Sequence, residues 1–428
     1  MSAAGMPEAA AGTATRSGTF RALRHRDYLV FWLGALVSNI GSWLQNLTVP
    51  FVVFQITGSA WWVGAATAAQ FAPGFVASPW GGHLADTRER RTLLLVLQSL
   101  MALAALGLWA VWTAGSPSLL AVLGLTAVMG LIWGLTLPSW QAFVNDLVPR
   151  DDLVSAVSLN SLQFNAARSI GPAIAGLVIA ALGPGWAFAL NAASFGVAVL
   201  AVALVSTRSR VEGRADAGTR MREGFLEALR YLPGQPGIVI VIVLVAVLGV
   251  IGTPVFGFTV VFAGSVYDVG ALQLGLLNAA LGVGAVMAVP LVVRSTSHGG
   301  LSGMLRGGLL AMGLGIVGFG LAPTYVLGLL CLVAVGLGFL ATISSGNTAL
   351  QLIVAQRLRG RVMAVRLMAY MASVPIGALA LGALSDRIGP RPTMVLSGAA
   401  LVGVVGLLLT PRGTRALRRV DDPQDTSA

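Results

Sequence analysis

The sequence predicts an all-α membrane protein in which twelve transmembrane helices form two pseudo-symmetric halves of six. Three observations lead to this fold class. Of the 428 residues, 56% are hydrophobic and only 10% are charged, a composition that excludes an ordinary soluble domain. Apolar stretches of roughly 20 residues, enough to cross about 30 Å of hydrocarbon as helices, recur along nearly the whole chain. The two halves of the chain also share a sequence pattern.

The apolar stretches are long and continuous, which favours helices over a β-barrel. We expect spans centred near residues 41, 72, 103, 130, 168, 196, 249, 282, 312, 338, 373 and 401. The expected domains are a cytoplasmic N-terminal tail (1–27), a six-helix bundle (28–206), a linker (207–235), a second six-helix bundle (236–410) and a cytoplasmic C-terminal tail (411–428). In the linker, Met221, Phe225, Leu229 and Leu232 recur at helical spacing, which predicts an amphipathic helix at the membrane surface.

The second half of the chain repeats the first at a shift of 206 residues. Gly130 falls on Gly336, and Trp133 falls on Phe339. The register continues through the next helix, where Gly171 falls on Gly377. This pattern indicates a parallel duplication, as in transporters whose two halves rock about a central site.

The basic residues orient the chain in the membrane. All 27 are arginine, and nearly all lie in the tails or in loops that follow even-numbered spans. Only Arg387 and Arg391 fall on the opposite side, and Arg168 lies inside a span. This bias places both termini in the cytoplasm. No cleavable signal is visible, so we expect a multi-pass protein of the inner (cytoplasmic) membrane.

Several classes of function are excluded or disfavoured. The net charge of +11 does not indicate nucleic-acid binding, because the arginines are topology signals in loops and no recognition module accompanies them. Cys331 is the only cysteine, so neither a disulfide within the chain nor a thiolate metal cluster can form. The chain has no lysine and hence no Gly-x4-Gly-Lys phosphate loop, which argues against ATP-driven transport. We expect no enzyme activity, no cofactor, no metal site and a monomer.

A charged island between two apolar runs carries the most informative pattern. Its matching residues are Gly82, Leu84, Ala85, Asp86, Arg90 and Arg91. The island resembles the Gly-x-Leu-Ala-Asp-Arg-x-Gly-Arg-Arg loop signature of the major facilitator superfamily, although Thr87 and Glu89 depart from it. The resemblance covers essentially the whole chain and implies a secondary transporter with the major facilitator fold. It assigns gating or coupling roles to Gly82, Asp86, Arg90 and Arg91, and Asp146 is expected to be the counterpart of Asp86 in the fourth helix.

Residues 138–176 narrow the resemblance. They are similar to the branch that contains the enterobactin exporters and the macrolide-efflux proteins. Within them, Gly171, Pro172 and Gly176 resemble the Gly-Pro-x-x-Gly-Gly sequence of antiporters and are expected to form a hinge. The spacing here is Gly-Pro-x-x-x-Gly, and residues 118–142 lack the arginine usual in drug/proton antiporters. Both departures weaken the inference of antiport.

Arg168 lies near the middle of the fifth span. A charge there costs about 3 kcal/mol or more unless it faces water or a partner. Two interpretations stay open: contact with a polar or anionic substrate group or a gate, and an arginine satisfied by helix carbonyls beside the Gly-Pro bend. The full set of expected cavity residues is Asn39, Trp43, Asn46, Trp133, Asn160, Gln163, Arg168, Asn347, Arg366 and Tyr370. For the amides in this set, hydrogen bonds between helices are the alternative.

The predicted function is export of an amphipathic small molecule, such as a drug, a siderophore or a secondary metabolite, by alternating access with proton coupling. The alternatives are an importer or facilitator of a polar metabolite, and a non-transporting membrane sensor or assembly protein. None of the sixteen acidic residues lies deep in a predicted helix. Asp86 is the best candidate for coupling by resemblance, but a structural or gating ion pair is favoured for it over a proton carrier.

Overall fold

The computed structural model describes residues 20–207, 227, 229–297 and 300–421, and these residues form helices joined by short turns. No strand occurs within these ranges. The long helices are α1 (Arg26–Thr57), α2 (Ala60–Thr87), α3 (Arg90–Thr113), α4 (Leu119–Asp146), α5 (Leu153–Leu182), α6 (Pro184–Leu204), α8 (Pro236–Val247), α9 (Pro254–Ser265), α10 (Ala271–Ser297), α11 (Leu301–Leu321), α12 (Tyr325–Ile353), α13 (Arg359–Ile388) and α14 (Pro390–Leu409). The short elements are η1 (Arg21–Arg24), η2 (Arg150–Asp152), η3 (Leu232–Gly234), the π-helical turn η4 (Leu248–Gly252) and α15 (Pro411–Asp421).

Among the described residues, ten helical segments are long and apolar enough to cross a membrane. One of them, Pro236–Ser265, consists of α8, η4 and α9 in succession. Helices α1 and α2, with 32 and 28 residues, are as long as these segments but are not among them. Their polar side chains include Asn39, Asn46 and Gln70. The all-helical membrane fold is confirmed, and the count of twelve spans stays a prediction.

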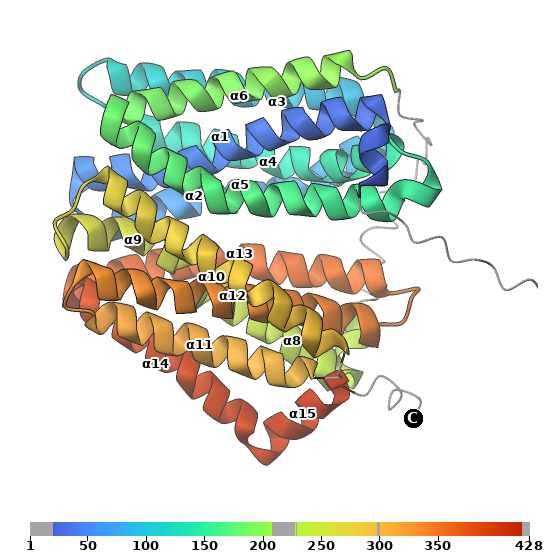
Figure 1. Ribbon diagram of the computed structural model, residues 1–428, viewed down its shortest axis with the longest axis vertical. Helices are drawn as coiled ribbons and strands as arrows, with labels where there is room; N and C mark the ends of the chain where they lie inside the picture. Colours follow the sequence, from blue (N-terminus) through green and yellow to red (C-terminus); the bar gives the residue numbers. More distant parts are fainter. Residues whose placement is uncertain (1–19, 208–226, 228, 298–299, 422–428) are drawn as a thin grey trace, which may run out of the picture.

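Figure 1 shows the helices in two groups, with α1–α6 above and α8–α15 below. The groups meet where α2 packs on α13 and where α5 packs on α10. Glycines matched by the 206-residue shift have equivalent places: a Cβ on Gly130 of α4 would lie 2.2 Å from a carbonyl oxygen of α2, and one on Gly336 of α12 would lie 1.9 Å from a carbonyl oxygen of α10. Only glycine permits such close helix approach.

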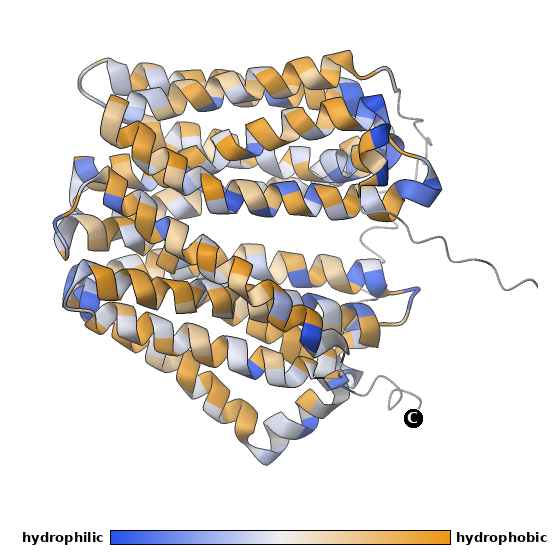
Figure 2. Ribbon diagram, in the orientation of Figure 1, coloured by the Kyte–Doolittle hydropathy of each residue, from blue (hydrophilic) through white to orange (hydrophobic). Residues whose placement is uncertain are grey.

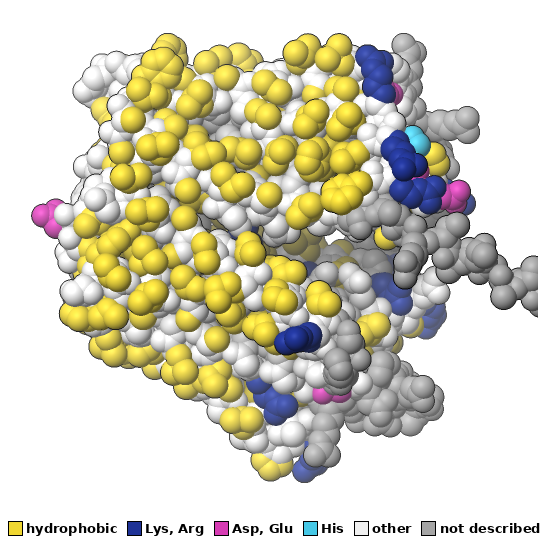
Figure 3. All heavy atoms as spheres, in the orientation of Figure 1, with side chains coloured by type: hydrophobic (Ala, Val, Ile, Leu, Met, Phe, Trp, Pro, Cys, Tyr) yellow, Lys and Arg dark blue, Asp and Glu magenta, His cyan; other side chains and the backbone are white. Residues whose placement is uncertain are grey.

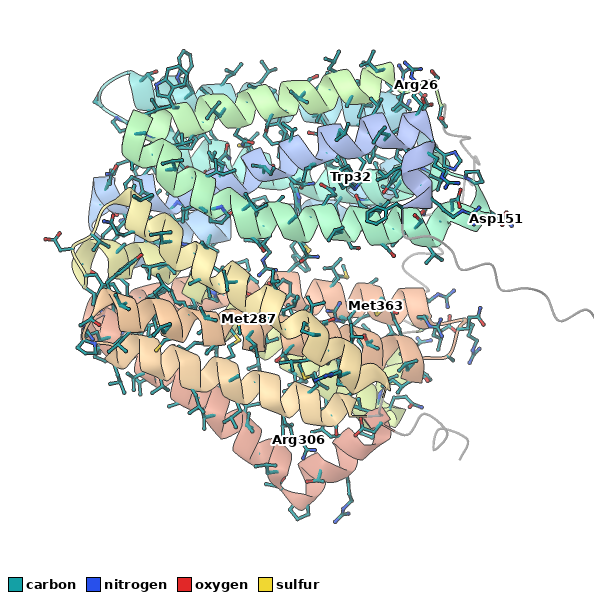
Figure 4. The ribbon with its side chains drawn as sticks, in the orientation of Figure 1. Arg26, Trp32, Asp151, Met287, Arg306 and Met363 are labelled. Atoms are coloured by element: carbon teal, nitrogen blue, oxygen red, sulfur yellow. The ribbon has the colours of Figure 1, made fainter. Side chains whose placement is uncertain are left out.

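The molecule has two ends that differ in charge. The basic end holds the start of α1 and the α2–α3 loop; Figure 4 labels Arg26 and Asp151 there. The opposite, distal end holds the α1–α2 turn at Gly58 and Ser59 and the loop after α9. Figure 3 shows arginines gathered at the basic end, and Figure 2 shows predominantly apolar helices between the ends. Large apolar side chains point outward along them, as expected of helices that face lipid.

Two helices differ from the predicted division of the chain into bundles and tails. Helix α1 begins at Arg26, two residues before the expected start of the first bundle. Within the expected tail 411–428, the described residues form α15, whose Leu417 and Val420 are buried and whose Asp421 accepts hydrogen bonds from the start of α11. Most of the predicted linker helix lies outside the described residues. Its described part ends in the short helix η3 at Leu232–Gly234.

Candidate functional site

Arg168 lies at the centre of the molecule, between the two groups of helices. Its guanidinium carbon is 4.7 Å from the ring centroid of Phe339, 5.1 Å from that of Phe256 and 5.5 Å from that of Trp43. These rings come from α12, α9 and α1, so aromatic side chains of both groups surround an arginine of α5. Each such contact contributes about 0.5–2 kcal/mol. The rings therefore offset part of the cost of keeping this charge between the helices.

Local backbone features position these rings. Gly171 lets α1 approach α5 closely, because a Cβ there would lie 2.5 Å from the Cβ of Trp43. The π-helical turn η4 precedes Pro254 and changes the phase of the helix before Phe256. Such single π-helical turns are frequent at functional sites. The sequence analysis included Trp43 but omitted Phe256 and gave Phe339 only as the repeat partner of Trp133.

A second arginine, Arg366 of α13, lies near the same space. Its Nε is buried and has no hydrogen-bond partner among the described residues. Tyr370, one turn further along α13, shares a hydrogen bond of 2.9 Å with the hydroxyl of Thr253 and lies close enough to both guanidinium groups to interact with them electrostatically. Within the described ranges, neither arginine forms an ion pair with an acidic side chain. The site is thus cationic with apolar aromatic walls.

The other predicted cavity residues divide into two sets. The amides of α1 and α5 bond to one another: Asn39 donates to Gln163 at 3.2 Å, and Gln163 donates to Asn160 at 3.2 Å. Asn46 accepts a hydrogen bond from Gln70 of α2. Hydrogen bonding between helices, the alternative weighed for these amides, is therefore observed. Trp133 packs against the apolar core of α1–α6, and Asn347 is partly exposed on α12.

Of the predicted gating residues around the end of α2, Arg90 and Arg91 bond to neighbouring helices and Asp86 does not. Arg90 pairs with both carboxylate oxygens of Asp146 at 2.8 and 2.9 Å. Arg91 donates to the carbonyls of Val202 and Ala203 at the end of α6. Asp86 is exposed and has no hydrogen bond or ion pair to any described residue. Asp146 is thus the partner of Arg90, and no contact links it to Asp86.

The predicted glycine and proline positions have different roles in the structure. A Cβ on Gly82 would meet nothing within 4 Å, whereas one on the preceding Gly81 would lie 2.8 Å from a carbonyl oxygen of α4. Gly176 packs on Gly275 of α10, with a Cβ there 2.6 Å from the Gly275 Cα. Pro172 lies within the single helix α5. The hinge role of Gly171, Pro172 and Gly176 stays a prediction.

Asp386 is a second residue, besides Phe256, that was not predicted as a site residue. It lies near the end of α13 and accepts hydrogen bonds from the start of α2: from the backbone N–H of Ala60 at 2.8 Å, the backbone N–H of Trp61 at 3.2 Å and the hydroxyl of Ser59 at 2.5 Å. A signal was available. At a shift of 300 residues, Gly82, Leu84, Asp86 and Arg91 fall on Gly382, Leu384, Asp386 and Arg391.

A family model described as "Transmembrane secretion effector" matches residues 17–424. The chain belongs to the transmembrane secretion effector family. This family is part of the major facilitator superfamily, whose members are membrane transporters and not enzymes.

Curated relatives of this chain are named as exporters. The enterobactin exporter EntS of Citrobacter koseri is 28% identical over 394 residues, covering 90% of this chain and 91% of the relative. EntS of Salmonella typhimurium is 27% identical over 398 residues, covering 90% and 92%. The match extends over nearly the full length of both proteins.

Solved structures show the same fold at low sequence identity. A bacterial homologue of the human lysosomal transporter Spinster, in an inward-facing and unoccupied conformation, superposes with a TM-score of 0.74 at 15% identity, covering 94% of this chain and 98% of that one. A D-xylose–proton symporter superposes with a TM-score of 0.68 at 16% identity, covering 87% and 96%. The chain therefore has the major facilitator fold.

Proposed function

We propose that this protein exports an amphipathic small molecule with an anionic group across the inner membrane by alternating access. The observation that carries the proposal is the pair Arg168 and Arg366, two cations between the helix groups without an acidic partner among the described residues. Buried charge is expensive, so such a site favours a ligand that brings the opposite charge. A drug, a siderophore or a secondary metabolite can do so.

The surroundings of Arg168 favour an amphipathic ligand over a small inorganic anion. The rings of Trp43, Phe256 and Phe339 offer apolar area beside the guanidinium group, and a planar guanidinium can bind a carboxylate or catecholate through two parallel hydrogen bonds. Enterobactin, named for the curated relatives, is a reasonable first ligand to test on this chain.

The conformation is compatible with loading from the cytoplasm. Figure 3 shows the two helix groups in contact toward the distal end and a hollow between them toward the basic end. If the basic end is cytoplasmic, as the arginine bias predicts, the hollow opens toward the cytoplasm. An exporter needs this conformation to collect its substrate.

The orientation and the twelve spans can be tested with single cysteines. Ser206 follows α6, and Ser265 ends α9; both side chains are exposed. In a Cys331→Ala background, Ser206→Cys and Ser265→Cys should react with a membrane-impermeant reagent from opposite sides of the membrane. Labelling of both from the same side would contradict the proposed topology.

The anion site can be tested by binding to purified protein. Arg168→Ala should weaken enterobactin binding at least tenfold, and Arg168→Lys should restore it only in part, because a point charge cannot replace a planar fork. Arg306→Ala is a matched control, since Arg306 of α11 bonds to Ser302 of its own helix near the basic end. If Arg168→Ala lowers only the melting temperature and leaves affinity unchanged, the arginine has a structural role and the anion site is refuted. Loss of binding in Arg306→Ala as well would indicate a nonspecific effect.

Proton coupling is part of the proposal, with Asp86 as the candidate residue by family resemblance. In inside-out vesicles, an acidic lumen should drive accumulation of the substrate by an exporter, because protons leave the lumen as the substrate enters it. Accumulation that is unchanged after the gradient is collapsed by a protonophore would contradict proton coupling. Accumulation only in right-side-out vesicles would show import.

A further inference from the structure

We propose that Asp386 is the gating residue that holds the distal end closed. Its carboxylate is attached to α13 and binds the first turn of α2, so its hydrogen bonds join the two helix groups. The inference rests on the proposed alternating access, because it concerns the balance between the two conformations of that cycle.

The contact is well suited to a gate because of its chemistry. The first N–H groups of a helix have no partner inside the helix and lie at the positive end of its dipole. A carboxylate that accepts from two of these groups and from the hydroxyl of Ser59 is therefore stabilised by charge as well as by hydrogen bonding. When the helix groups separate, all of these contacts are lost together.

Helices α2 and α13 also pack closely on each other around the Asp386 contact. A Cβ on Gly382 would lie 2.7 Å from the carbonyl oxygen of Ala60, and one on Gly64 would lie 2.2 Å from the carbonyl oxygen of Ala378. Deeper between α2, α9 and α13, the space around Val63, Thr67 and Phe258 has no room for a water molecule. Backbone contacts thus close the interface between α2 and α13 at this end, and Asp386 lies at its outer edge.

Asp386 is also held in place within its own helix group. Arg391, five residues later, donates to the carbonyls of Gly320 and Ala322 at the end of α11 and so fixes the turn between α13 and α14. The carboxylate therefore moves with α10–α14 as a unit. The Asp386 carboxylate on one group and the first turn of α2 on the other form a contact that is either made or broken, as a two-state transition of a transporter requires.

The experiment measures distances at both ends by spin labelling of purified, substrate-free protein, in a Cys331→Ala background. One pair of cysteines, at Trp186 and Ser265, reports on the distal end; a second pair, at Asp151 and Gln356, reports on the basic end. Asp386→Asn should raise the ratio of distal-open to distal-closed molecules about tenfold, because it removes the charge that the helix start binds. The distal distance should lengthen and the basic-end distance should shorten in the same molecules.

Two controls keep the test interpretable. Asp268→Asn removes another acid at the distal end, one with no hydrogen bond or ion pair to a described residue, and should leave both distance distributions unchanged. Asp386→Glu keeps the charge and should shift the ratio less than Asp386→Asn does. If Asp386→Asn does not fold, Ser59→Ala removes one donor and should shift the ratio in the same direction by a smaller factor.

The outcomes are distinct from those of the binding test. Unchanged distances in Asp386→Asn would overturn the gate, as would a lowered melting temperature with unchanged distances, which would make Asp386 a static cap of α2. Equal opening in Asp268→Asn would also overturn it. None of these results depends on a substrate, so failure of the anion site leaves this proposal standing, and the reverse also holds.

Discussion

Residues 82–91 and 382–391 carry the same spacing of glycine, leucine, aspartate and arginine at opposite ends of the molecule, and their aspartates differ in state. Asp386 binds the first turn of α2, whereas Asp86 is exposed and has no hydrogen bond or ion pair to a described residue. The glycines differ in the same way, with Gly382 tightly packed and Gly82 facing open space. The arginines do not differ, because each caps the carbonyls of a helix in its own group. The contacts of the aspartate and of the glycine therefore differ between the two ends of the molecule, whereas the contacts of the arginine do not.

The antiparallel packing of α2 and α13 explains why two such segments occur. At the distal end, the last turn of α13 meets the first turn of α2. Asp86 lies on the last turn of α2, so closure of the basic end would bring it toward the first turn of α13 at Arg359. As an extension of the proposal, each aspartate is expected to stabilise one of the two conformations of the proposed cycle.

The largest effect is expected from Asp86→Asn. The substitution should reduce transport about tenfold or more, because it weakens the conformation closed at the basic end, while substrate binding to the conformation described here stays intact. Vesicle transport and equilibrium binding, measured on the same preparation, separate the two properties. Asp151→Asn, which removes an exposed acid at the same end, serves as the control. Transport at the parent rate at every pH would show that Asp86 is dispensable.

A smaller effect, on stability, should distinguish the two glycines. In Gly382→Ala the new methyl group would lie 2.7 Å from the carbonyl oxygen of Ala60, so we expect a loss of about 1–3 kcal/mol and a lower melting temperature. In Gly82→Ala the methyl group meets nothing within 4 Å, and the higher helix propensity of alanine should leave stability unchanged or raise it by up to about 1 kcal/mol. Equal losses in both variants would refute the difference in packing between the two ends.

Hydropathy and charge were sufficient to predict most of the fold. Long apolar runs, punctuated by arginine-rich loops, specify helices such as α3 and α14 because unpaired backbone groups are too costly in lipid. Pairings between distant residues could not be predicted in the same way. Phe256 is one aromatic residue among many in an apolar helix, and its place over Arg168 depends on the π-helical turn before it, which no periodic pattern encodes.

The candidate site was predicted in part for a related reason. An arginine in the middle of a span is conspicuous, because its cost demands compensation, so Arg168 could be identified from the sequence. The amides Asn46 and Gln163 are ambiguous in a sequence, since the same side chain can bind a ligand or a neighbouring helix, and here they bond to other helices. Asp386 was readable from its spacing to Gly382 and Arg391, but its partner at the start of α2 is more than 300 residues away along the chain.

The smallest effect is expected where the two segments agree. Arg91 donates to the carbonyls of Val202 and Ala203 at the end of α6, and Arg391 donates to those of Gly320 and Ala322 at the end of α11. A cation at the negative end of a helix, with hydrogen bonds to its last carbonyls, contributes about 1 kcal/mol.

Arg91→Ala and Arg391→Ala should therefore each lower the melting temperature by a few degrees, by similar amounts. Neither should change the spin-label distances at either end, because both contacts lie within one helix group and persist when the groups rock. The lysine variants should recover part of the stability, since lysine keeps the charge but loses the fork. An Arg391→Ala variant that opens the distal end would contradict the division of roles: the arginine would then hold Asp386 in place for the gate, and the two segments would differ in every part of their shared pattern.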